Sequence, residues 1–258
     1  MISIFDSGVG GLTVLKEINK KMPEYDLVYF GDSARAPYGG KSEDEIKKYA
    51  LEDIEFLQEK GAKLIVIACN TVSTIAFDFL KEEVKLPLFG MVNSVVTSAV
   101  TTTKNNHIGV LGTQATINSG VYEKRIKVYA HNRNMKVDIF SQSAPTLVPL
   151  IESGKLSDNK TKKIVEDYLK IFKDNKIDTL VLACTHYHLL KNIIKNYLGD
   201  EVRIIDPGTA IAEEINTFLK NQTVIENSLI KNSKVNIYFS KNSDAITNLT
   251  KDILGDSA

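Results

Sequence analysis

The two cysteines of this chain stand in matching local patterns that suit acid/base chemistry. Cys69 lies in AKLIVIACNTVST and Cys184 lies in IDTLVLACTHYHL, so each follows an apolar strand-like run and precedes a helix start. A thiol at a helix N-terminus is close to free backbone N–H groups and to the positive end of the helix dipole, which favour the thiolate. A single free cysteine is often only a small buried apolar residue. The matched pair instead predicts two thiols that act as bases or nucleophiles.

A second pair of segments extends this internal similarity. IFDSG, beginning at Ile4, matches VLGTQ, beginning at Val110. The separation of these two segments along the chain is comparable to the separation of the two cysteine segments. Two similar halves are therefore predicted, each placing its cysteine just past the carboxyl end of a strand. Ligands of open α/β sheets bind at that edge, so a crevice between the halves is the expected site.

Apolar runs alternate with amphipathic stretches of helical length along the whole chain. This alternation predicts an α/β protein with mostly parallel sheets. One helix is expected over Ser42–Lys60, opened by a Ser42-x-x-Glu45 capping box, and another over Ser157–Asp174. The expected strands are Ile2–Phe5, Leu27–Phe30, Lys63–Ala68, Leu86–Gly90, His107–Leu111, Val137–Phe140, Thr179–Ala183, Val202–Ile205 and Val235–Phe239.

Two loops that follow expected strands carry polar and flexible residues. In FDSGVGGLT, Asp6 and Ser7 follow the first strand, and the glycines let the backbone approach a small anionic ligand. Asp6 is equally suited to capping a turn or a helix. The segment GDSARAPYGGKS, from Gly31 to Ser42, either lines a pocket or simply connects a strand to a helix.

Three familiar motifs are excluded by single residues. A dinucleotide-binding turn needs glycine where Thr13 stands, and a nucleotide phosphate loop needs glycine where Arg35 stands. A cysteine phosphatase loop needs arginine at the position of Leu190.

A metal site is the rival interpretation of the second cysteine. Cys184, His186 and His188 alternate as ligands on a strand would, which suits zinc and a metal-dependent hydrolase. No fourth ligand follows at motif spacing, so we expect no metal.

The composition is that of an ordinary globular protein. The chain has 258 residues, with 32 Lys+Arg against 32 Asp+Glu, and this zero net charge gives no attraction to phosphate backbones, so nucleic acid is not an expected partner. No apolar run reaches the roughly 20 residues of a bilayer helix and no signal-peptide pattern opens the sequence, so we expect no membrane association and a cytoplasmic location. Two cysteines cannot form a disulfide framework, and a reducing compartment keeps them as thiols.

Seven ordered motifs over nearly the whole chain resemble those of glutamate racemases, cofactor-independent enzymes of bacterial cell-wall synthesis. The motifs are FDSGVGGLTVL, YFGDSARAPYGGKS, IACNT, LGTQATI, LVPLIESG, LACTHYHLL and IDPG. The resemblance implies two α/β domains, residues 1–92 plus 206–258 and residues 93–205, with the active site between them. It also implies a homodimer that interconverts L- and D-glutamate for peptidoglycan synthesis without a metal or pyridoxal phosphate.

The resemblance also assigns roles to individual residues of the matching motifs. Cys69 and Cys184 are the implied acid/base catalysts, and Asp6 and His186 are implied to assist them. His188 stands where the family generally has proline, so the conformation near Cys184 transfers less directly. The implied contacts to the substrate ammonium and carboxylates are Asp6, Ser7, Tyr38, Gly39, Asn70, Thr71, Thr185 and His186.

Two thiols on opposite faces of an amino acid suit racemisation. One base removes the α-proton from one face and an acid returns a proton to the other, whereas a single base tends to restore the starting enantiomer. With an ordinary thiol pKa of about 8.5, thiol and thiolate coexist at mildly alkaline pH. An aspartate racemase with the same chemistry and a non-catalytic, two-domain amino-acid binding module are the alternatives that the sequence leaves open.

Overall fold

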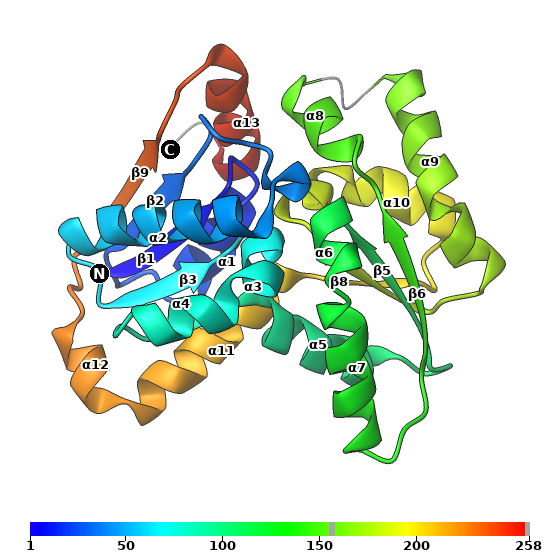
Figure 1. Ribbon diagram of the computed structural model, residues 1–258, viewed down its shortest axis with the longest axis horizontal. Coiled ribbons are helices and arrows are strands. Elements are labelled where there is room, and N and C mark those ends of the chain that lie inside the picture. Colours follow the sequence, from blue (N-terminus) through cyan, green and yellow to red (C-terminus); the bar gives the residue numbers. More distant parts are fainter. Residues whose placement is uncertain (155–157, 256–258) are drawn as a thin grey trace.

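Two parallel β-sheets lie side by side in the molecule, the first in the N-terminal part and the second in the middle of the chain (Figure 1). The computed structural model describes residues 1–154 and 158–255. The strand order is β4-β3-β1-β2-β9 in the first sheet and β6-β5-β7-β8 in the second, and every pairing is parallel. The predicted α/β fold with parallel sheets is confirmed.

Each predicted strand is present, with ends that shift by up to three residues. Strand residues alternate between the two faces of the sheet, so that Ile2 and Ile4 pack in one apolar core and Phe5 in the opposite one. The strands are Ile2–Asp6 (β1), Leu27–Gly31 (β2), Leu64–Ile67 (β3), Leu88–Gly90 (β4), His107–Gly112 (β5), Asp138–Ser143 (β6), Thr179–Ala183 (β7), Arg203–Ile205 (β8) and Val235–Phe239 (β9).

Helices cover both faces of each sheet, and they begin where the sequence provides caps. The predicted capping box of Ser42 and Glu45 is formed at the start of α2, and Asp158 caps α9; the expected start at Ser157 lies outside the described residues. The helices are Leu12–Lys21 (α1), Tyr38–Gly40 (η1), Glu43–Glu59 (α2), Asn70–Ile75 (α3), Phe77–Glu83 (α4), Met91–Thr102 (α5), Gln114–Asn118 (α6), Val121–His131 (α7), Leu147–Glu152 (α8), Asn159–Asp174 (α9), Thr185–Leu190 (η2), Lys191–Leu198 (α10), Pro207–Asn221 (α11), Thr223–Ser228 (α12) and Asp244–Leu254 (α13).

The two sheets repeat one arrangement. In the first, β1 lies between β2 and β3, with β4 beyond β3; in the second, β5 lies between β6 and β7, with β8 beyond β7. The segments IFDSG and VLGTQ therefore occupy equivalent strands, β1 and β5, and the cysteines follow equivalent strands, β3 and β7. This is the internal similarity that the sequence predicted.

The C-terminal part of the chain returns to the first sheet. Strand β9 pairs with β2, and α11 packs against α1 (Figure 1). We propose on this basis that residues 1–92 with 206–258 form one domain and residues 93–205 the other. None of the helices in the described ranges is long and apolar enough to span a membrane.

Candidate active site

A small cavity lies between the carboxyl ends of strands from both sheets. Its volume is about 20 Å³, which is room for about one water molecule. Residues that follow β1, β3, β5 and β7 meet around it, which is the edge where the sequence analysis expected a ligand. The lining residues are Ser7, Pro37, Tyr38, Gly39, Cys69, Asn70, Thr71, Thr113, Val148, Cys184, Thr185 and His186.

Every residue assigned to the site from the sequence lines this cavity except Asp6, which is fully buried and bonds the cavity residue Thr185. The segment Gly31–Ser42 contributes Pro37, Tyr38 and Gly39, so it lines a pocket and is more than a connection. Gly39 approaches the opposite sheet closely, because a Cβ atom on it would lie 2.7 Å from Cβ of Thr113.

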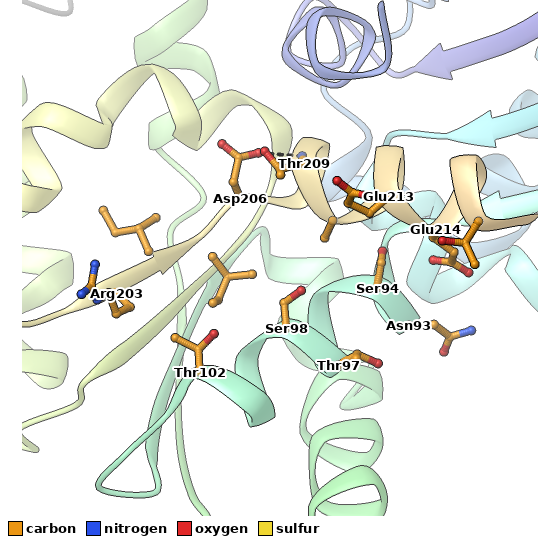
Figure 2. Close-up of a pocket in the computed structure, with 14 residues that line it drawn as sticks. Asn93, Ser94, Thr97, Ser98, Thr102, Arg203, Asp206, Thr209, Glu213 and Glu214 are labelled. Atoms are coloured by element: carbon orange, nitrogen blue, oxygen red, sulfur yellow. Dashed lines mark hydrogen bonds between the residues drawn. The ribbon is translucent and has the colours of Figure 1, made fainter. Parts of the chain in front are cut away.

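A larger cavity, of about 680 Å³, lies elsewhere. Figure 2 shows it between polar side chains of α5, such as Ser94 and Ser98, and acidic side chains of α11, Glu213 and Glu214, near the end of β8. Neither cysteine lines it. Size therefore does not identify the site here; the thiols and the strand ends do.

Cys69 is the N-cap residue of α3, and its side chain is buried. Its Sγ donates a hydrogen bond to Oγ of Ser7 over 3.4 Å. Burial, together with the negative charge of Asp6, raises the pKa of Cys69 to about 12. The expectation that the helix start would favour the thiolate is wrong for this residue, because α3 has only six residues and desolvation outweighs its dipole.

Cys184 precedes η2 and lies in a chain of interacting groups. His186 is hydrogen-bonded to Cys184 on one side and to Glu152 on the other, with 3.0 Å between His186 Nε2 and Glu152 Oε1. Burial by itself lowers the pKa of His186, but these two bonds and the charge of Asp6 outweigh it and raise the pKa to about 10. A protonated His186 therefore stands beside Cys184.

Asp6 combines both roles that its position suggested. Its carboxylate accepts hydrogen bonds from the backbone N–H groups of Gly8 and Gly11, as a turn-capping residue does. It also accepts from Oγ1 of Thr185, across the gap between the halves, over 3.3 Å. Complete burial raises the pKa of Asp6, although the charge of His186 and the backbone N–H groups act against the rise.

Tyr38 is held in place by a partly buried ionic network. Its hydroxyl donates to Asp32 over 2.5 Å and lies 3.2 Å from Asp53, and Arg35 pairs with both of these carboxylates and with Glu52. Burial, and the negative charge of Asp32 next to it, raise the pKa of Asp53 to about 8. The loop that carries Tyr38 and Gly39 is thereby anchored to α2.

Two further residues belong to the site but were not singled out from the sequence. Thr113 caps α6 and lies 3.0 Å from Thr71 of the opposite half, hydroxyl to hydroxyl, and Glu152 partners His186. Both stand inside the recognised motifs, LGTQATI and LVPLIESG, and the match of IFDSG with VLGTQ also aligns Thr113 with Ser7.

The three residues of the rival metal site do not converge. His186 is directed to Glu152, whereas Nδ1 of the partly buried His188 lies 3.7 Å from Asp206. Within residues 1–154 and 158–255, no group of three or more His, Cys, Asp or Glu side chains is arranged to hold a metal ion.

Comparison with known proteins agrees with this geometry. The family model for Asp/Glu/Hydantoin racemase matches residues 11–215. A glutamate racemase of Aquifex pyrophilus is 44% identical over 98% of this chain and 94% of its own length.

Solved structures of similar proteins cover nearly the whole fold. A glutamate racemase isoform, RacE1, of Bacillus anthracis superposes with a TM-score of 0.90 at 32% identity, over 99% of this chain and 94% of that one. A glutamate racemase of Francisella tularensis in complex with D-glutamate superposes with a TM-score of 0.87 at 33% identity, over 98% and 92%. The chain therefore belongs to the Asp/Glu/Hydantoin racemase family and is similar to its glutamate racemases over almost its entire length.

Proposed function

We propose that the protein is a glutamate racemase that interconverts L- and D-glutamate. The observation that carries the proposal is the pair of buried cysteines, Cys69 and Cys184, which line one cavity from equivalent positions of two similar halves. Racemisation needs a base on one face of Cα and an acid on the other, and this arrangement supplies one thiol from each side. The similarity to glutamate racemases along both full lengths supports glutamate as the substrate.

In one direction, Cys184 begins as a thiolate and Cys69 as a thiol. The Cys184 thiolate takes the α-proton, the electron pair of that C–H bond stays on Cα, and Cys69 then gives its own proton to the opposite face. The enzyme is left with Cys184 as a thiol and Cys69 as a thiolate, and the reverse reaction uses these forms. The high pKa of Cys69 makes its thiolate a strong base, which suits the very weakly acidic α-proton.

Charged neighbours assist each thiol in this scheme. Protonated His186, held by Glu152, stabilises negative charge on Cys184. We infer that Asp6, which bonds Thr185 across the two halves, binds the substrate ammonium, and that this cation in turn favours a thiolate at Cys69. We infer that Ser7, Tyr38, Gly39, Asn70, Thr71 and Thr185 bind the ammonium and carboxylate groups, since all of them line the cavity.

The cavity is closed in the present conformation, because its 20 Å³ cannot hold an amino acid. Substrate entry therefore requires the two halves to separate. Closure then removes water, which strengthens every hydrogen bond to the charge that develops on Cα and its carboxylate.

The alternatives have less support. The structures of an aspartate racemase from Picrophilus torridus and of an aspartate racemase homologue from Pyrococcus horikoshii are 21% and 20% identical to the chain, so they show a shared fold alone. A binding module without catalysis needs no matched thiols. The resemblance further leads us to propose a cytoplasmic homodimer that supplies D-glutamate for peptidoglycan and uses no cofactor.

Incubation with L-glutamate in D2O tests the proposal. Purified protein with reducing agent and chelator, and without added pyridoxal phosphate, is expected to abolish optical rotation while deuterium enters the α-position. A folded protein with both thiols free that exchanges neither glutamate enantiomer contradicts a glutamate racemase; exchange with aspartate alone identifies the aspartate enzyme, and no exchange with either leaves the binding module.

Single substitutions test the two-base assignment. Cys69→Ala and Cys184→Ala are each expected to abolish racemisation while circular dichroism shows an intact fold. Substantial turnover by either variant overturns the assignment of two bases.

A further inference from the structure

Tyr122 is a buried tyrosine whose hydroxyl group contacts Asn70, one of the residues that line the cavity. It belongs to α7 in the second half, and its Oη donates to Oδ1 of Asn70, in the first half, over 2.5 Å. Both side chains are almost fully buried, at 2% exposure each. The hydroxyl also lies close enough to Cys184 for the two groups to interact electrostatically.

The amide of Asn70 has one atom without a partner. Oδ1 accepts the hydrogen bond from Tyr122. Nδ2 is buried, and no group among the described residues accepts a hydrogen bond from it. An unmade hydrogen bond of a buried donor is costly, so such a donor points to a ligand group that accepts from it. Asn70 lines the cavity, so the free N–H groups are available to what binds there.

The chemistry of the donor defines the group that it recognises. An amide Nδ2 donates and cannot accept, so it pairs with a carboxylate and not with an ammonium group. Asn70 directly follows Cys69, whose thiol must reach the α-hydrogen, so the carboxylate beside it is the one attached to Cα. That carboxylate gains negative charge as Cα loses its proton, so a hydrogen bond donated to it then becomes stronger.

We infer that Tyr122 is a positioning residue, which orients the amide of Asn70 so that Nδ2 donates to the substrate α-carboxylate when the halves close. The inference rests on the proposed function, because it names how that substrate is held. With the amide turned over, Oδ1 would face the carboxylate and repel it, and the Tyr122 proton would lose its acceptor. The contact joins the two halves, so the donor is aligned only in the closed state.

The test combines substitutions at both positions. Tyr122→Phe keeps the ring and removes only the hydroxyl; it is expected to lower kcat/KM for glutamate by up to about tenfold, the effect of one neutral hydrogen bond, because the hydroxyl bonds the uncharged amide of Asn70. In an Asn70→Ala background the same change is expected to have no further effect. Tyr129→Phe is the matched control, because Tyr129 lies two turns further along α7 and its hydroxyl accepts from the exposed Arg133; this variant is expected to retain wild-type activity.

A substitution of the amide itself reports on its orientation. Asn70→Asp is expected to be less active than Asn70→Ala, because a carboxylate oxygen would replace Nδ2 opposite the substrate carboxylate. An Asn70→Asp variant more active than Asn70→Ala would mean that the side chain faces the ammonium, and the inference would be wrong. Equal activity of Tyr122→Phe and wild type, or a full additional loss in the double variant, also contradicts it.

Binding of D-glutamate, measured by calorimetry, separates this inference from the proposed function. Wild-type protein that binds D-glutamate without racemising it contradicts the function, and Tyr122→Phe must still bind it more weakly if the inference is right. Racemisation by wild type with an unaffected Tyr122→Phe contradicts the inference alone. Urea unfolding of each variant confirms that it is folded.

Discussion

The Nε2 atom of His186 lies 3.0 Å from Oε1 of Glu152, so an acidic residue of α8 holds the histidine that stands beside Cys184. Glu152 is one-third exposed and His186 is buried, which places the charged pair between the catalytic cavity and the outside. The pair is the clearest asymmetry of the site, because the hydrogen bonds of Cys69 are to the neutral hydroxyl of Ser7 and to the backbone of Val72.

Glu152→Gln is expected to lower kcat/KM by about 10- to 100-fold, the effect of one hydrogen bond to a charged group. The substitution removes a contact that raises the pKa of His186 to about 10, so the histidine loses its proton at lower pH. The alkaline limb of the pH–rate profile should therefore move to lower pH, which a profile of kcat/KM measures. Glu166→Gln, on α9 and away from the cavity, is the control; an unchanged alkaline limb in Glu152→Gln would contradict the role of Glu152.

Gly39→Ala is expected to impair activity because a Cβ atom would lie 2.7 Å from Cβ of Thr113, which belongs to the opposite half. Thr113 or the loop of Gly39 must shift to relieve this contact, so the two halves close less completely and KM rises. Gly40→Ala is the matched control, since a Cβ there meets nothing within 4 Å. Steady-state kinetics of the two neighbouring variants decide the point: equal KM values would show that close approach at Gly39 is unimportant.

Asp6→Asn is expected to lower the pKa of Cys69, because it removes a negative charge that contributes to the rise to about 12. The pH dependence of thiolate ultraviolet absorbance, measured in a Cys184→Ala background where Cys69 is the only thiol, reports this pKa directly. Asp6→Asn in the otherwise wild-type protein should also racemise glutamate more slowly, since Asp6 bonds Thr185 and the backbone N–H of Gly8. The exposed Asp200→Asn is the control, and a Cys69 titration that shifts equally in both variants would contradict the assigned cause.

Asp53 is expected to make stability depend on pH. Its pKa is about 8 in the folded protein and about 3.9 in the unfolded chain, so between these values the folded state binds one more proton. Its contribution is complete below pH about 4 and is lost as the pH rises through about 8, with a slope of at most about 1.4 kcal/mol per pH unit. Urea unfolding at several pH values should show a flatter dependence for Asp53→Asn than for wild type. An identical slope in the two proteins would mean that Asp53 is ionised in the folded state.

The sequence determined the elements and the reactive groups of this protein. Strands such as Thr179–Ala183 and the capping box at Ser42 are local patterns, because alternation, burial and caps depend on neighbouring residues. The equivalent positions of Cys69 and Cys184 were also readable, since both cysteines follow an apolar strand that ends in alanine, and this repeated strand-Ala-Cys segment is a local pattern. The two halves and the site between them follow from these local facts.

Only the tertiary structure decided how those groups are paired and charged. Glu152 reaches His186, and Tyr122 reaches Asn70, from elements far away in the chain, and no local pattern encodes such contacts. The pKa of Cys69 depends on complete desolvation and on Asp6, which is why the expectation from the helix start had the wrong sign. Burial and long-range contacts arise only when the halves close together, so the ionisation of the site is a property of the assembled fold.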